Sequence, residues 1–120
     1  MLGCGAIGTQ IALAIDSGKI PATLTHVYDI EQSHAENLVS KLRQKPEVVS
    51  NSHLLSSNSV ELVVEAASQD AVRNDAVSIL QNKKDMMIMS AGALLDESVF
   101  EVISDAVSYT HLTLPTKRIV

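Results

Sequence analysis

Apolar residues recur with helical spacing in four segments of the chain. In the first segment the spacing places their side chains on one face of a helix, and these residues are Ile7, Ile11, Ala14 and Ile15. Gly18 follows and Pro21 prevents the helix from resuming, because glycine favours helix C-termini and proline lacks an N–H donor. The pattern therefore predicts an amphipathic helix that Gly18 closes.

Three further segments show the same spacing. Their expected inward-facing residues are Ala35, Leu38, Val39 and Leu42 in the second helix, Val72, Ala76, Ile79 and Leu80 in the third, and Val99, Phe100 and Ile103 in the fourth. Ser68 and Asp96 precede the third and fourth segments. They are expected N-caps, since their side-chain oxygens can accept the free N–H groups of a first helical turn.

Short runs rich in β-branched and apolar residues lie between these helices. They predict strands within residues 23–28, 47–50, 60–67 and 85–90. The run at 60–67 is apolar on both faces at its centre, as in a strand buried between two layers of helices. Residues 51–58 are rich in Ser and Asn and are expected to form a connection with one helical turn.

This alternation of helices and strands predicts an α/β fold with an open parallel sheet and right-handed crossovers. The 120 residues suffice for one small domain. Aromatic side chains are scarce, at two Tyr and one Phe, so the core must be aliphatic. Met86, Met87 and Met89 are expected to fill it.

A glycine-rich motif, Gly3-Cys4-Gly5-Ala6-Ile7-Gly8, opens the first helix. It matches the G-x-G-x-x-G fingerprint of Rossmann-type dinucleotide-binding folds, and Asp29 lies 21 residues beyond its last glycine, at the end of the next strand. Gly3 would permit the tight turn, Gly5 the approach of the pyrophosphate, and Gly8 close packing of the helix. Ala6 and Ile7 complete the pyrophosphate loop at the helix N-terminus.

Asp29 indicates which dinucleotide the fold would take. Its carboxylate would accept hydrogen bonds from the adenosine ribose and repel a 2′-phosphate, and Ile30 after it offers no arginine clamp. NAD is therefore the expected cofactor, with NADP kept as an alternative.

Only Met1 and Leu2 precede the first glycine, where this fold normally has a central strand of about five residues. We therefore expect the first strand to be largely missing and its neighbours to be exposed. The expectation is an N-terminally truncated domain.

Small residues follow the two later strands at the sheet edge where α/β folds bind ligands. Glu65 ends one strand and is followed by Ala66 and Ala67, and Ser90 and Gly92 follow the next. These small residues would leave room for a cofactor ring, or they are simply turn residues. Both interpretations stay open.

Charge and composition exclude several other functions. The net charge of −5, with no basic cluster larger than a pair, disfavours nucleic acid as a partner. The longest nearly apolar stretch, residues 86–95, is about half the length of a bilayer span, so no membrane anchor is expected. The histidines show no metal-ligand spacing, so no metal site is expected; they are His26, His34, His53 and His111.

Cys4 is the single cysteine and occupies a variable position of the fingerprint. It is expected to be a small space-filling residue, since a redox thiol normally has a second cysteine nearby. A lone thiol fits a reducing compartment, and no secretory signal is visible at the start of the chain. A cytoplasmic location is the resulting expectation.

Four blocks together resemble a known family: the glycine motif, Val27-Tyr28-Asp29, Val63 to Gln69, and Met89-Ser90-Ala91-Gly92-Ala93-Leu94. Over residues 3–106 the chain is similar to the N-terminal half of the L-aspartate dehydrogenases, within the homoserine-dehydrogenase-like NAD-binding group. The resemblance implies reversible NAD(P)-dependent oxidation of L-aspartate, through iminoaspartate, to oxaloacetate and ammonia, linked to NAD biosynthesis.

In that family a second domain supplies the substrate pocket and a catalytic histidine. Nothing in this chain matches that domain, and His111 lacks the family's surroundings, so we assign no catalytic residue and expect the isolated chain to be inactive. An amino-acid substrate is expected only for the full-length enzyme, for which a homo-oligomer is an open alternative.

Residues 107–120 break the family pattern abruptly and resemble translated adapter sequence. We therefore expect a cofactor domain over residues 1–106 followed by a non-native tail. Two alternatives stay open. One is the NAD-binding domain of homoserine dehydrogenase or another amino-acid dehydrogenase, and the other is a non-catalytic module that senses NAD(H).

Overall fold

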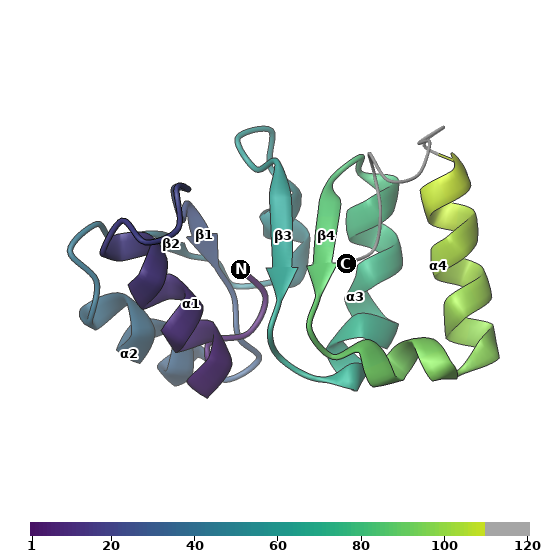
Figure 1. Ribbon diagram of the computed structural model, residues 1–120, viewed down its shortest axis with the longest axis horizontal. Coiled ribbons are helices and arrows are strands. Elements are labelled where there is room, and N and C mark those ends of the chain that lie inside the picture. Colours follow the sequence, from purple (N-terminus) through teal and green to yellow (C-terminus); the bar gives the residue numbers. More distant parts are fainter. Residues whose placement is uncertain (110–120) are drawn as a thin grey trace.

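The computed structural model describes residues 1–109 (Figure 1). Helices α1 (Ala6–Asp16), α2 (Gln32–Ser40), α3 (Gln69–Gln81) and α4 (Glu97–Tyr109) alternate with strands β1 (His26–Val27), β2 (Glu47–Val48), β3 (Leu62–Glu65) and β4 (Asp85–Ile88). Residues 1–109 also contain two short 3₁₀ helices, η1 (Ser52–Ser56) and η2 (Ala91–Leu95). The predicted order of elements is confirmed, although each strand is shorter than its predicted run.

The strands pair in parallel, β1 with β2 and β3 with β4. The first residues of the chain lie between these two pairs, as the N-terminus in Figure 1 shows, and Leu2 forms parallel bridges to both Tyr28 and Glu65. The backbone order is therefore β2, β1, residues 1–3, β3, β4. This is the α/β, Rossmann-type arrangement that the sequence predicts.

Four hydrogen bonds between peptide groups hold residues 1–3, the central stub of the sheet. On one side, Leu2 N–H donates to the Val64 carbonyl and Ala66 N–H to the Leu2 carbonyl, both at 2.8 Å. On the other, Gly3 N–H donates to the Tyr28 carbonyl at 2.8 Å, and Tyr28 N–H to the Met1 carbonyl at 2.9 Å. The last residues of the first strand are thus in place, and they join the two strand pairs into one sheet.

The amino-terminal part of the same strand position is open. A hollow of about 480 Å³ lies between residues 21–25 and 59–62, with Met1 at one end. Leu62, at the start of β3, is 46% exposed, while Val63 at the centre of the strand is buried. The strand residues beside this hollow are therefore uncovered, as the sequence predicts.

Two apolar clusters cover the two faces of the sheet. Because successive strand residues point to opposite faces, Met1 and Val27 pack in one cluster, with α1 and α2, while Leu2 and Val63 pack in the other, with α3 and α4. The predicted inward residues of α2 and α3 lie in these clusters, either buried or, in the case of Val39, partly buried. Among residues 1–109, no helix is long and apolar enough to cross a bilayer.

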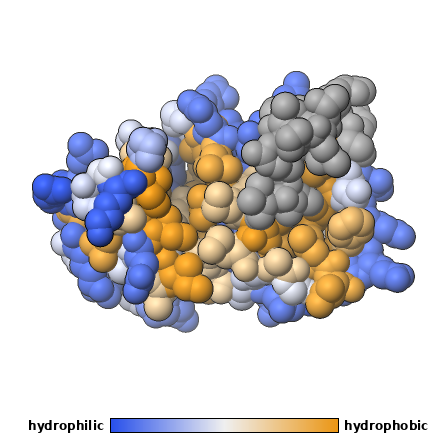
Figure 2. Space-filling view, in the orientation of Figure 1, coloured by the Kyte–Doolittle hydropathy of each residue, from blue (hydrophilic) through white to orange (hydrophobic). Residues whose placement is uncertain are grey.

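Two residues that the sequence predicts to face the core are exposed instead, so these predictions are wrong. Ile7 in α1 is 56% exposed, because the buried face of this helix carries Gly8 and Ala12 and turns Ile7 outward. Phe100 in α4 is 51% exposed, since this helix packs through Val99, Ile103 and Ala106. Figure 2 shows apolar surface over α1 on the face in view.

The methionines divide in the same way. Met86 is fully buried in the core, as predicted, and Met87 is half-buried. Met89 is 48% exposed, so the expectation that it fills the core is wrong. It follows the last residue of β4 and lies beyond the sheet that would cover it.

The helix ends are fixed as the sequence indicates. Gly18 has a φ of +85°, the left-handed conformation that ends α1. Ser68 Oγ accepts the Ala71 N–H at 3.1 Å and caps α3. The Asp96 carboxylate accepts the Ser98 N–H at 3.0 Å at the start of α4, and hydrogen bonds from Ser98 hold the pKa of Asp96 below its usual value.

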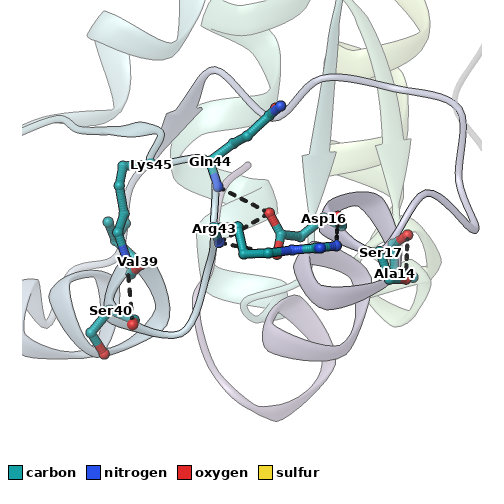
Figure 3. A network of polar contacts seen from close by, with 8 residues as sticks. All are labelled: Ala14, Asp16, Ser17, Val39, Ser40, Arg43, Gln44 and Lys45. Atoms are coloured by element: carbon teal, nitrogen blue, oxygen red, sulfur yellow. Dashed lines mark hydrogen bonds and ion pairs between the residues drawn. The ribbon is translucent and has the colours of Figure 1, made fainter.

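The far end of α1 is tied to the loop after α2 (Figure 3). The Asp16 carboxylate accepts the backbone N–H groups of Arg43 and Gln44, at 3.1 Å each for the shorter contacts. The Arg43 guanidinium lies 3.5 Å from the same carboxylate. These backbone hydrogen bonds, with the Arg43 side chain, hold the pKa of Asp16 below its usual value.

Helix α4 continues through residues 107–109, and Val107 packs partly buried against the core. The remainder of the predicted tail, with His111, lies outside the described residues. The boundary at residue 106 therefore stays a prediction.

Candidate functional site

The glycine motif forms the turn between the central stub and α1. Gly3 has a φ of +103°, and a Cβ added there would lie 2.7 Å from backbone atoms of Ala66 and Ala67. A Cβ at Gly8 would lie 2.3 Å from the Gly3 carbonyl oxygen. Only glycine fits at these two positions without movement of the backbone.

Gly5 differs from these two glycines. A Cβ added to it would meet nothing within 4 Å, and its φ is −80°, so the protein's own packing does not require glycine there. Gly5 is also the N-cap of α1, with no side-chain cap and no acidic residue in the first turn. The free N–H groups of this turn, next to open space, suit an anion such as a phosphate.

Asp29 lies against the glycine motif. One carboxylate oxygen accepts the Cys4 N–H and the other accepts the Glu31 N–H, both at 2.8 Å. His34 Nδ1 is 3.7 Å from the second oxygen. Each carboxylate oxygen still has accepting capacity for a further donor, so the geometry is suited to a ligand that carries hydroxyl groups beside the loop.

The Cys4 side chain is buried, with its thiol 3.7 Å from the Tyr28 carbonyl oxygen. Burial, followed by the nearby charge of Asp29, raises the pKa of this thiol to about 11. The thiol is therefore protonated at neutral pH and is not a nucleophile. This agrees with the expectation of a space-filling residue.

Glu65 closes the edge of the sheet at the ends of β3 and β4. Its side chain is fully buried. Oε2 accepts the Ala67 N–H at 2.7 Å and the Ser90 hydroxyl at 2.8 Å, while Oε1 accepts the Ser90 N–H at 2.8 Å. The sequence predicts Glu65 at this edge but indicates no role for it. An acid inside a buried strand was the available signal, since such a group needs partners.

Gly92 packs against the first turn of α3. A Cβ there would lie 2.3 Å from the Gln69 side-chain nitrogen. The turn after β4 is thus fitted to α3, and the turn after β3 is fitted to Gly3.

The structure brings the residues singled out from the sequence to one end of the sheet. In Figure 1 the start of α1 and the turns after β3 and β4 lie at the same end. Gly3 and Gly8 are buried, and the others are at least partly exposed: Gly5, Ala6, Ile7, Asp29, Ala66, Ala67, Ser90 and Gly92. The edge offers backbone N–H groups, carboxylates and small side chains.

This arrangement offers groups that can bind a ligand. Both carboxylates at the edge are engaged by backbone donors. In the part of the chain that the structure describes, no group of three His, Cys, Asp or Glu side chains is placed to hold a metal ion.

A parallel sheet, a glycine turn that opens a helix, and an acid held against that turn define a Rossmann-type dinucleotide-binding domain. A family model described as "Homoserine dehydrogenase, NAD binding domain" matches residues 3–114. The chain belongs to this family of NAD-binding domains, and the expected cofactor, NAD, is the one this family binds.

Curated relatives refine the comparison. The chain is 63% identical over 106 residues to an L-aspartate dehydrogenase of Nitrosopumilus maritimus (strain SCM1), a match that covers 88% of this chain and 39% of that protein. It is 42% identical over 103 residues to an L-aspartate dehydrogenase of Methanocella arvoryzae, with coverage of 86% and 37%. The chain thus spans about two fifths of the length of these relatives.

A solved structure supports the fold. A crystal structure of an NAD-binding protein from Listeria innocua superposes with a TM-score of 0.63 at 20% sequence identity, covering 88% of this chain and 31% of that one.

Proposed function

We propose that the chain is the NAD-binding part of an NAD(P)-dependent L-aspartate dehydrogenase. The observation that carries the cofactor half of this proposal is the contact between the Asp29 carboxylate and the glycine turn. It brings the acid that we assign to the ribose against the turn that we assign to the pyrophosphate. The substrate half is supported by the 63% identity to a protein named L-aspartate dehydrogenase.

Each residue at the edge has a task in this proposal. The N–H groups at the start of α1, from Ala6 to Gly8, hold the pyrophosphate beside the open space at Gly5. Asp29 accepts hydrogen bonds from the adenosine ribose. The small residues at the ends of β3 and β4 leave room for the nicotinamide; they are Ala66, Ala67, Ser90 and Gly92.

The proposed reaction is a hydride transfer followed by hydrolysis. When bound, NAD⁺ would accept a hydride from the α-carbon of L-aspartate while the nitrogen lost a proton, which would give iminoaspartate, NADH and H⁺. Water then converts iminoaspartate to oxaloacetate and ammonia. The residues of this chain bind and orient the dinucleotide. We assign the substrate pocket and the groups that move protons to the part of the relatives' length that this chain does not span.

Two narrower statements belong to the same proposal. We infer a cytoplasmic location, because the chain has a single cysteine, Cys4, and a lone thiol fits a reducing compartment. We infer that the amino-acid substrate, and any second subunit, are bound only by the longer protein.

NADH binding by the 120-residue chain tests the cofactor half. Titration calorimetry is expected to show that NADH binds more tightly than NADPH. Asp16→Asn is the matched control, since it alters a carboxylate at the far end of α1 that also holds a loop through backbone N–H groups. Failure of the folded wild-type chain to bind either dinucleotide would refute the cofactor half.

The substrate half needs the locus around this reading frame. We would express the frame with its flanking sequence and follow NAD⁺ reduction at 340 nm with L-aspartate and, separately, with L-homoserine. Reduction with L-aspartate supports the proposal. Reduction with L-homoserine alone, or NADH binding without any reduction, would replace it with the homoserine enzyme or with a nucleotide-sensing module, respectively.

A further inference from the structure

We propose that Glu65 is a positioning residue that sets the shape of the nicotinamide side of the dinucleotide site. It would do so by holding the turns after β3 and β4 in a fixed relation to each other. This inference rests on the proposed function for its ligand, while the contacts that carry it belong to the chain itself.

One buried carboxylate serves three donors from two turns. The Ala67 N–H comes from the turn after β3, and the N–H and hydroxyl of Ser90 come from the turn after β4, all within 2.8 Å. Glu65 and Ser90 are 25 residues apart in the chain. Hydrogen bonds to a charged acceptor are shorter and stronger than neutral ones, so this contact fixes both turns firmly.

The pairing of the two strands does not need this carboxylate. β3 and β4 are already joined along four residue pairs, from Leu62 with Asp85 to Glu65 with Ile88, and the Met89 N–H extends the ladder to the Glu65 carbonyl at 3.0 Å. The side chain of Glu65 acts beyond the end of this ladder. What it adds is the placement of Ala67 and Ser90.

Both turns border the proposed site directly. The turn at Ala66 and Ala67 lies against Gly3, where even a methyl group would not fit. The turn after Ser90 carries Gly92, which lies against Gln69 at the start of α3. In the proposed site, a small movement of either turn would therefore change the space left for the nicotinamide.

A carboxylate is a costly way to fill a core position, since a buried charge loses its hydration. All three partners of Glu65 are donors, so only an acceptor with two oxygens satisfies them together. In Glu65→Gln one oxygen becomes an NH₂ group, which would face a donor. This substitution keeps the side-chain volume and removes the acceptor for one of the donors.

The test compares NADH with ADP-ribose, which lacks the nicotinamide, on the 120-residue chain. We expect Glu65→Gln to weaken NADH binding by about tenfold or more, the loss of about 1.4 kcal/mol of interaction, and to change ADP-ribose binding by less than about twofold. A merely structural role would weaken both ligands alike. Equal loss of both, or no loss of either in the folded variant, would overturn the proposal.

Two further variants keep the test sharp. Ser90→Ala removes one of the three donors and is expected to show the same selectivity at smaller size, and the double variant is expected to be no weaker than Glu65→Gln alone. Asp16→Asn, measured beside them, controls for lost stability because it removes a similar contact far from this edge.

Hydrogen exchange separates this inference from the proposed function. The amides of Ala67 and Ser90 should exchange faster in Glu65→Gln than in the wild type, whether or not a dinucleotide binds. If the wild-type chain binds no NADH, the proposed function fails. If it binds NADH but these two amides keep their protection in the variant, the proposed positioning role of Glu65 is wrong.

Discussion

The backbone N–H of Cys4 donates a 2.8 Å hydrogen bond to the carboxylate of Asp29, 25 residues further along the chain. This bond joins the glycine turn to the end of β1, so the acid that is proposed to bind the ribose also fixes the loop that is proposed to bind the pyrophosphate. The two parts of the proposed dinucleotide site are therefore in direct contact.

Asp29→Ala is expected to lose both functions of this carboxylate. NADH affinity should fall by about tenfold or more, since a hydrogen bond to a charged group contributes roughly 1.5–3 kcal/mol. The preference for NADH over NADPH should narrow, because the charge that repels a 2′-phosphate is gone. Calorimetric titration with both dinucleotides measures this, and an unchanged preference would argue against Asp29 as the selecting residue.

Substitutions of Gly8 and Gly5 should affect different properties, stability in the first case and NADH binding in the second. Gly8→Ala places a methyl group 2.3 Å from the Gly3 carbonyl oxygen and should lower the free energy of unfolding by about 1–3 kcal/mol. Gly5→Ser places its side chain in open space, at a helix N-cap that favours serine. We expect it to keep full stability and lose NADH affinity. Urea unfolding and titration of both variants test this pair, and a destabilised Gly5→Ser would contradict it.

The amino group of Met1 makes stability depend on pH. It is buried, donates to the His26 carbonyl, and burial lowers its pKa from 8.0 to about 6. Between pH 8 and pH 6 the unfolded chain therefore binds more protons than the folded one, so stability rises with pH across this window. Two pKa units correspond to roughly 2.7 kcal/mol as an upper limit.

Acetylation of the N-terminus isolates this contribution. It removes the charge and keeps an N–H donor, so the acetylated chain should lose the part of the pH dependence that the free amine causes. The comparison is the urea midpoint of both forms at pH 6 and pH 8. Identical pH profiles would show that the amine does not titrate in this way.

The hollow beside Met1 should accept added strand residues. A short extension of Val and Ile fused ahead of Met1 can pair with residues 23–25 and 59–62 and bury apolar surface there. We expect a higher urea midpoint. The matched control carries proline at alternate positions, which removes N–H donors and disrupts the strand. Equal effects of both extensions would show that the hollow does not select an extended segment.

Much of this fold follows from sequence pattern, and its exceptions have physical causes. The inward stripe of α3 was predicted in full, because a central helix buries one regular face. The stripes of α1 and α4 each included one exposed residue, Ile7 and Phe100. Periodicity alone does not tell which edge of an apolar stripe the neighbouring element covers. In α1 the close contact between Gly8 and Gly3 decides it.

The candidate site was partly predictable for a different reason. The glycine motif and Asp29 are a local motif and a strand end at a characteristic separation, so their contact could be expected. The partners of Glu65 could not, because Ser90 lies 25 residues away and its register against β3 is set by the strand pairing.

The central stub has a consequence for how the domain would respond to its ligand. Residues 1–3 are the seam between the two strand pairs, and the glycine turn emerges directly from that seam. A dinucleotide that spans from Asp29 to Ser90 would contact both strand pairs and link them reversibly across residues 1–3. The free energy of unfolding would then rise with the concentration of the dinucleotide, since a ligand bound only by the folded state adds its free energy of binding to folding.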